Sequence, residues 1–156
     1  MKSEADILEK YKKMQEKYEL PQFKQLKQAF KFETEGVDSV DQLRMEISDQ
    51  LFSFTERVIE HIMTGGDSFC CMFEQDMVSE EERKSMFEIY KKIQMLKWEN
   101  NLLMIRPNDK QTVEWIRKTW DLWNNELEGE MSRVCKKLSL AWSDLTFKSE
   151  KTQYHG

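Results

Sequence analysis

Apolar side chains return every three or four residues along most of this chain, which is the spacing of one face of an α-helix. Over roughly residues 4–19 the stripe consists of Ile7, Leu8, Tyr11, Met14 and Tyr18. The positions between them are mostly lysine and glutamate. Pro21 cannot continue the helix because it has no backbone N–H. The pattern therefore predicts an amphipathic N-terminal helix that ends before Pro21.

A longer helix is predicted over about residues 39–63. Asp38 or Ser39 can cap it, with Gln42 three residues after Ser39 as in a capping box, and Gly65-Gly66 can end it. One apolar stripe holds Val40, Leu43, Ile47, Leu51, Phe54, Val58 and Ile62, and a second holds Met45, Phe52, Ile59 and Met63. Two stripes indicate burial on more than one side, so this helix is expected at the centre of the fold.

Three further helices are predicted in the C-terminal half, over about residues 79–104, 109–123 and 125–145. The first begins at a capping box formed by Ser79 and Glu82. The expected breaks between them are Arg106-Pro107 and Asn124-Asn125. The apolar segment 67–78, which precedes these helices, is predicted as a loop or a single helical turn.

The fold class predicted from this pattern is all-α. No segment alternates as a strand would, and five glycines and two prolines supply few tight turns. We expect a helical bundle of four main helices with an additional N-terminal amphipathic helix. The chain divides into a basic N-terminal helix (1–19), an apolar connector (20–37), the bundle (38–146) and a flexible tail (147–156).

The connector lies at a charge border. Residues 1–32 contain eight lysines and five acids, a net charge of about +3, whereas the remainder carries about −8. Two interpretations stay open: the connector folds back and closes one end of the bundle, or the arm opens and grips a partner by a helix-in-groove contact. The predicted partner-binding residues are Tyr11, Tyr18, Phe23, Leu26, Phe30 and Phe32.

Composition limits the class of protein. Apolar residues make up 39% and charged residues 34%, which is too apolar for a disordered chain and too charged for a membrane protein. Three cysteines, two of them adjacent, form a poor disulfide framework, and no apolar leader follows the first residues, so a cytoplasmic location is expected. A net charge of −5 argues against general nucleic-acid affinity.

No metal site, cofactor or catalytic residue is predicted. The possible zinc ligands are His61, Cys70, Cys71 and Cys135, but adjacent cysteines rarely reach one tetrahedral ion together. A cysteine nucleophile would need Cys70 or Cys71 close to His61, which the spacing across Gly65-Gly66 permits without specifically supporting it.

Acidic residues one helical turn apart leave another possibility open. Glu56 and Glu60 form such a pair, as do Glu126 and Glu130. Carboxylates that converge from two helices could bind a divalent metal in a small all-α hydrolase. Such pairs are also expected by chance in a chain with 29 acids, where they normally face solvent.

The run Leu20-Pro21-x-Phe23-x-x-Leu26-x-x-x-Phe30-x-Phe32-Glu33 resembles the N-terminal signature of a group of small all-helical archaeal proteins of unknown function. Further similarities are Leu43, Arg44 and Ile47 at a helix start, Met72-Phe73-Glu74 in a loop, Tyr90-Lys91-Lys92 and a late Trp142. The resemblance covers roughly residues 18–145. It implies a cytoplasmic archaeal helical domain.

The predicted function is a non-catalytic protein-interaction module that binds a protein partner or its own copy. The alternative is the metal-dependent hydrolase, and a third is association with nucleic acid or the ribosome through the basic arm. For the interaction module, we expect deletion of residues 1–19 to leave the body folded and to weaken partner binding.

Overall fold

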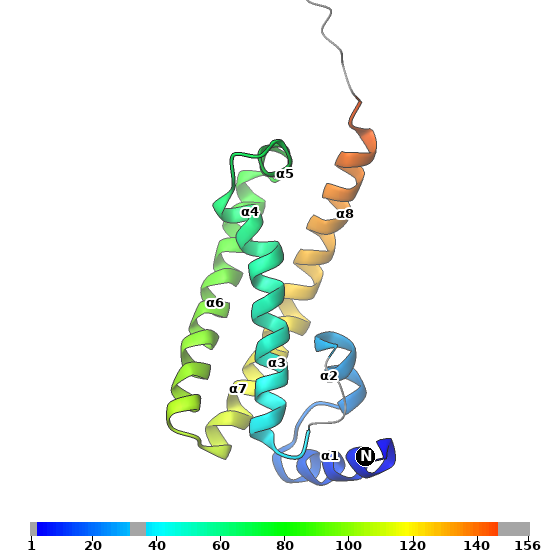
Figure 1. The fold of residues 1–156 in the computed structure, drawn as a ribbon, viewed down its shortest axis with the longest axis vertical. Coiled ribbons are helices and arrows are strands. Elements are labelled where there is room, and N and C mark those ends of the chain that lie inside the picture. Colours follow the sequence, from blue (N-terminus) through cyan, green and yellow to red (C-terminus); the bar gives the residue numbers. More distant parts are fainter. Residues whose placement is uncertain (1–2, 32–36, 147–156) are drawn as a thin grey trace, which may run out of the picture.

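The computed structural model describes residues 3–31 and 37–146, and over those residues the protein is all-α without a strand, as predicted (Figure 1). Its helices are α1 (Glu4–Tyr18), α2 (Phe23–Phe30), α3 (Val40–Phe54), α4 (His61–Thr64), α5 (Phe69–Met77), α6 (Glu80–Ile105), α7 (Asp109–Leu122) and α8 (Glu128–Asp144). Two wider π-helical segments join some of them: η2 (Thr55–Glu60) between α3 and α4, and η3 (Trp123–Leu127) between α7 and α8.

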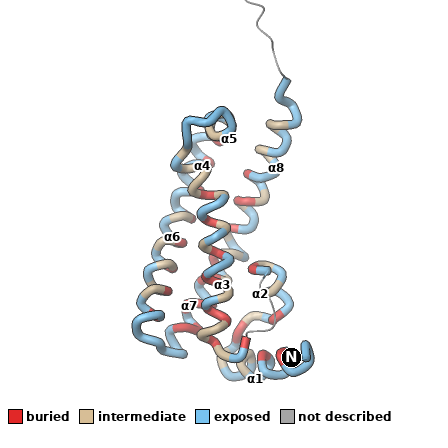
Figure 2. The backbone as a smooth tube through the Cα atoms, in the orientation of Figure 1, coloured by how far each residue is buried: buried red, intermediate tan, exposed pale blue. Residues whose placement is uncertain are grey.

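Three long helical rods form the body. The rod α3–η2–α4, here called the central rod, contacts both α6 and α7, and α7 also packs directly against α6, so the three rods form one bundle (Figure 1). At one end of the body α1 and α2 pack around the start of α3, and at the opposite end the short helix α5 joins α4 to α6. Buried residues recur along all three rods, and in α8 they are Met131 and Val134 in its first half (Figure 2).

The ends of the central rod follow the sequence signals. The Ser39 hydroxyl accepts a hydrogen bond from the Gln42 N–H at 3.2 Å and so caps the first turn. The rod ends at Gly65, whose φ of 69° lies in the region that residues with a Cβ avoid. Between these points Leu43, Ile47 and Leu51 of the first predicted stripe are fully buried, whereas in the second stripe Ile59 is buried and Met45 is exposed, so the first stripe is buried more completely than the second.

The predicted break at Asn124-Asn125 is wrong. Both asparagines lie inside η3, and the backbone stays helical from α7 into α8. The buried residues Leu122 and Leu127 are five positions apart, one more than an α-helical turn spans, and a π turn accommodates the additional residue. The predicted fourth and fifth helices are therefore one rod, and the division into four main helices is not confirmed.

The two π segments lie close together, and a buried threonine stands at the start of η2 and another four residues before η3. Thr55 and Thr119 are buried, and the hydroxyl of each donates to a carbonyl four residues earlier, that of Leu51 and Trp115 respectively, at 2.8 Å. Phe54 directly precedes η2, and Trp123 is the first residue of η3. Their ring centroids lie 6.0 Å apart. Because such side-chain bonds compete with the helical ladder, they favour local widening at both places.

Two segments expected to be irregular are helical. Segment 67–78, predicted as a loop or single turn, contains the nine-residue helix α5, capped by Ser68. The connector contains α2, whose Phe23, Leu26 and Phe30 are buried in the main core. Residues 32–36 of the connector and the predicted tail 147–156 lie outside the described residues.

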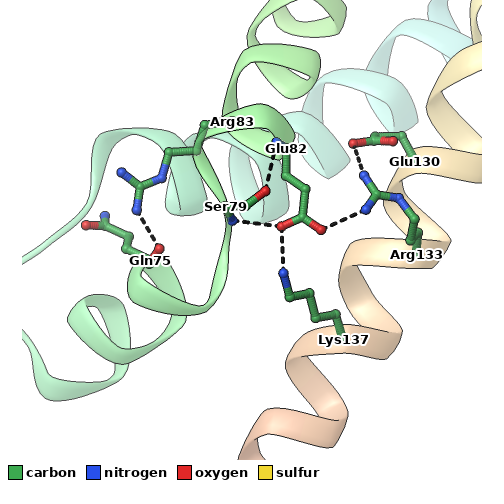
Figure 3. A network of polar contacts seen from close by, with 7 residues as sticks. All are labelled: Gln75, Ser79, Glu82, Arg83, Glu130, Arg133 and Lys137. Atoms are coloured by element: carbon green, nitrogen blue, oxygen red, sulfur yellow. Dashed lines mark hydrogen bonds and ion pairs between the residues drawn. The ribbon is translucent and has the colours of Figure 1, made fainter.

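The buried carboxylate of Glu82 links α6 to α8. Glu82, on the first turn of α6, accepts hydrogen bonds from the ammonium of Lys137 at 2.8 Å and from the guanidinium of Arg133 at 2.7 Å (Figure 3). The Ser79 backbone N–H donates to the same carboxylate at 2.8 Å, which confirms the predicted capping box. The helix cap therefore also fixes the packing of α8 against α6.

Candidate interaction surface

The predicted partner-binding residues lie mostly inside this chain's own core. Tyr11, Phe23, Leu26 and Phe30 are buried, and Tyr18 is half-buried. The rings of Tyr11 and Phe23 meet at 4.8 Å between centroids. The connector thus closes one end of the body, as the first of the two interpretations expected. Contact of these side chains with a partner would require the arm to undock, and it stays a prediction; Phe32 lies outside the described residues.

Polar contacts hold the arm to the connector and to the body. The Tyr11 hydroxyl donates to the Pro21 carbonyl at 2.6 Å, and burial raises the pKa of this phenol well above its usual value. Lys10 pairs with Asp38 at 3.0 Å, and the Arg117 guanidinium donates to the Tyr18 carbonyl. Part of the positive charge of the arm is therefore engaged by the body.

The acidic pairs do not converge on a common point. Glu60 accepts a hydrogen bond from the Tyr90 hydroxyl at 3.0 Å, while Glu56 is exposed. Glu126 pairs with Lys92 at 2.6 Å, and Glu130 pairs with Arg133 at 2.7 Å. In the described part of the chain no three His, Cys, Asp or Glu side chains are grouped so that they could hold a metal ion. The hydrolase alternative gains no support from this arrangement.

An unpredicted surface runs along α6. Four large apolar side chains, Met95, Trp98, Leu102 and Ile105, are more than half exposed, with Trp98 at 70% and Ile105 at 76%. Their steps of three, four and three residues place them on one side of the helix. We call these four residues the outer stripe.

The core stripe of α6 has the same spacing. Its members are Met86, Ile89, Ile93, Leu96, Asn100 and Leu103, all buried. Each member of the outer stripe follows a core position by two residues, a rotation of about 200° at 3.6 residues per turn. The outer stripe therefore faces directly away from the core. A helix with two opposite apolar faces is typical of one that packs against neighbours on both sides.

A groove lies beside the outer stripe, between α6 and α7. It has a volume of about 370 Å³, with Met95, Leu96 and Leu122 among its lining residues. Two ion pairs connect the helices around it, Lys92 with Glu126 at 2.6 Å and Lys118 with Glu99 at 3.3 Å. The groove and the stripe together form an apolar strip with charged edges, the composition expected for an interface.

The outer stripe could have been found from the sequence. The period of the long helix over 79–104 assigns one face to the core, and the remaining large apolar residues then fall on the opposite face. The signal is the repeat of the same spacing two residues later. The sequence shows that the helix has two apolar faces but not which of them is buried. The packing of α6 against α3 and α7 shows that the buried face is the core stripe.

No protein-family model, no curated protein and no solved structure matches this chain. The resemblance to archaeal helical proteins therefore stays a prediction. Within the described ranges, no helix combines the length and apolar character needed to cross a bilayer.

Proposed function

We propose that this protein is an interaction module that pairs with a second copy of itself through the outer stripe of α6. The observation that carries the proposal is the exposed heptad spacing of Met95, Trp98, Leu102 and Ile105 on the face opposite the core. The same spacing forms the seam of paired helices, in which side chains of one helix fill the gaps between those of the other.

The size of this surface suits a dimer. Phe87, also exposed, lies on the same side of α6 as the outer stripe, since it precedes Trp98 by three helical turns. At roughly 100–150 Å² of exposed area for each side chain, the five residues present about 600 Å² per copy, at the lower end of the ~600–1,000 Å² per partner of a standard interface. Left in water, an apolar patch of this size is uncommon on a monomer.

The charges at the edge of the stripe favour a like partner. Around it lie Glu88, Lys91, Lys92, Lys97 and Glu99 on α6, Lys118 and Asp121 on α7, and Glu126 on η3. Both signs are present in similar numbers, although the whole chain carries a net charge of −5. Two copies can therefore approach through this face with less repulsion than through the acidic remainder.

Sedimentation equilibrium between about 1 and 200 µM tests the proposal. We expect the wild-type protein to change from monomer to dimer in this range, because interfaces of this area commonly reach micromolar affinity. The double variant Trp98→Lys, Leu102→Lys places two like charges per copy on the stripe, and we expect it to weaken dimerisation at least about 100-fold.

Leu140→Lys is the matched control, since Leu140 on α8 is 64% exposed but lies outside the stripe. It should dimerise like the wild type, and all variants should melt like the wild type at low concentration. A wild-type protein that stays monomeric over the whole range overturns the proposal. So does a double variant that dimerises as strongly as the Leu140→Lys control.

A cytoplasmic location accompanies the proposal, supported by three cysteines that are all free thiols. Binding of nucleic acid by the basic arm and metal-dependent hydrolysis remain alternatives. The first predicts a steep loss of binding with salt, and the second predicts thermal stabilisation by Mg²⁺ that Glu56→Gln with Glu60→Gln removes.

A further inference from the structure

A second group of polar side chains gathers at the opposite end of the body from α1, where α4, α5 and α8 meet (Figure 1). Cys71 Sγ lies 3.8 Å from Nδ1 of His61. His61 Nε2 lies 2.6 Å from a carboxylate oxygen of Glu74. Trp142 Nε1 donates to the other oxygen of Glu74 at 3.0 Å. Thiol, imidazole and carboxylate thus stand in one line of contacts.

The local sequence builds this line directly. Cys71 and Glu74 are three residues apart and share one face of α5. The Gly65-Gly66 turn folds α5 back against α4, so that this face meets His61, which lies one turn before the end of the rod. A Cβ on Gly65 would overlap the Gln75 side chain, and one on Gly66 would lie 3.2 Å from Cys71 Sγ. The turn comes this close to the thiol because both residues are glycine.

The protonation pattern follows from the carboxylate. Hydrogen bonds from His61 first and Trp142 second hold the pKa of Glu74 below its usual value, so Glu74 is an anion that only accepts. In neutral His61 the proton must then sit on Nε2, facing Glu74. Nδ1 is left with its lone pair toward Cys71 and can take the thiol proton. This is the order of nucleophile, base and orienting acid that activates a weak nucleophile.

The thiol is also placed at the favourable end of a helix. Cys71 is the third residue of α5, and its N–H donates to the Ser68 hydroxyl at 3.2 Å. The first two N–H groups of α5, those of Phe69 and Cys70, have no carbonyl acceptor within the helix. Amide N–H groups at a helix start stabilise a thiolate and can receive a developing oxyanion.

The surroundings favour an apolar acyl group over a redox partner. Cys71 is half-buried, and apolar rings adjoin the line of contacts: Phe69 and Phe73 stack on each other and pack against Trp142, the residue that donates to Glu74. Cys70 is the neighbouring thiol, but consecutive Cα atoms are about 3.8 Å apart, below the roughly 4.4 Å that a disulfide needs. The two cysteines are therefore not suited to act as a dithiol pair.

We propose that Cys71 is a nucleophile that accepts acyl groups from activated esters and thioesters. The Cys71 proton passes to Nδ1 of His61 while the Sγ–C bond forms at the carbonyl carbon. The C–O or C–S bond to the leaving group then breaks, and His61 returns the proton to that group. The product is an acyl thioester on Cys71. Water then attacks its carbonyl carbon while His61 takes the water proton, the C–Sγ bond breaks to release a carboxylic acid, and His61 returns the proton to Sγ. Glu74 is a positioning residue that holds the imidazole.

The test uses p-nitrophenyl acetate and two single-thiol proteins: Cys70→Ser with Cys135→Ser, which keeps Cys71, and Cys71→Ser with Cys135→Ser, which keeps Cys70. Release of p-nitrophenolate and the mass of the intact protein report acylation. We expect Cys71 to be acylated at least about tenfold faster than Cys70, since a positioned base contributes a factor of about 100 or more in an optimised site. Cys70, exposed and adjacent, is the matched control.

Two substitutions then test the roles. His61→Gln should reduce the Cys71 rate to that of Cys70. Glu74→Gln should slow Cys71 while leaving the Cys70 rate unchanged, which a general loss of structure would not do. Equal rates for the two single-thiol proteins overturn the proposal, and so does a Cys71 rate that His61→Gln leaves unchanged. If the His61→Gln protein melts well below the wild type, its slower rate has a structural cause. The acylation rates of the two single-thiol proteins, measured with both folded, then decide whether Cys71 is the activated nucleophile.

Discussion

The Glu82 carboxylate lies 2.8 Å from the Lys137 ammonium, although 55 residues separate them along the chain. The same carboxylate closes the capping box with Ser79 at the start of α6. One side chain therefore begins a helix and also anchors α8 to it. This double role makes Glu82 the best-placed ionisable group through which pH can act on the fold.

Glu82 predicts a loss of stability in acid. The hydrogen bond from Lys137 is the main cause that lowers its pKa from 4.5 to about 2. Because the folded state binds this proton more weakly than the unfolded state, the stabilisation is complete above about pH 4.5 and declines as the pH falls toward 2. The free energy of unfolding, measured by urea titration at pH 7, 4 and 3, should fall stepwise over this range.

Replacement of the carboxylate separates this effect from general acid denaturation. Glu82→Gln should cost about 1–2 kcal/mol at pH 7, since Lys137 and Arg133 are half exposed and solvent screens part of the attraction. The loss should shrink toward pH 2. Glu80→Gln, in the exposed pair with Lys84, should change stability by less than about 0.5 kcal/mol. Equal effects of the two variants at pH 7 would contradict the role given to Glu82.

The hydrogen bond of the Tyr11 hydroxyl should contribute measurably to holding α1 against the connector. It is buried and donates to the Pro21 carbonyl at 2.6 Å, so Tyr11→Phe should destabilise the protein by about 1–2 kcal/mol. Tyr18→Phe is the matched control, because the Tyr18 hydroxyl makes only a 3.5 Å contact with Asp109 at the surface. Thermal melts of the two variants give the comparison. A Tyr11→Phe protein as stable as Tyr18→Phe would show that the arm is loosely held.

Deletion of residues 1–19 should lower stability substantially. Ile7 and Tyr11 are buried in the main core, and the loss of two such side chains removes about 3–6 kcal/mol. The interaction-module hypothesis expected a body that stays folded without the arm, whereas the interpretation in which the connector closes the bundle expects a loss of stability. Guanidinium denaturation of the truncated chain decides between them, and an unchanged midpoint would restore the free arm.

Several helix boundaries were predictable from local backbone chemistry, although the helix start at Ser68 was missed. Ser39, Ser79 and Gly65 mark ends that depend only on local chemistry. The continuity of α7 into α8 was not predictable, because Asn124 and Asn125 are locally poor helix formers. Their π turn is maintained by Leu122 and Leu127, which pack in the core on either side of it. A distant packing constraint thus overrides a local signal.

The candidate sites could likewise be predicted from the sequence only where they depend on neighbouring residues. The spacing of His61 and Cys71 across a glycine turn allowed them to meet, and in the structure they do. The contribution of Glu74 and Trp142 could not be read from the sequence, since their hydrogen bond joins residues 68 positions apart. The outer stripe was hidden for a different reason: Met95 and Trp98 look like core residues until the other face of α6 is known to be covered.

Two glycines should respond in opposite directions to the same substitution. Gly129 lies within α8 with no neighbouring atom within 4 Å of an added Cβ, and alanine forms helix better than glycine. Gly129→Ala should therefore stabilise the protein by about 0.5–1 kcal/mol. Gly65 has a φ of 69°, and its Cβ would overlap Gln75. Gly65→Ala should destabilise by at least about 1 kcal/mol.

The Gly65 variant also tests how the end formed by α4 and α5 is built. Gly65→Ala with Gln75→Ala removes the overlap but keeps the positive φ, so it should recover part of the loss and no more. Differential scanning calorimetry of the three glycine variants measures both effects. Full recovery in the double variant would mean that the contact with Gln75, and not the backbone conformation, requires glycine at this turn.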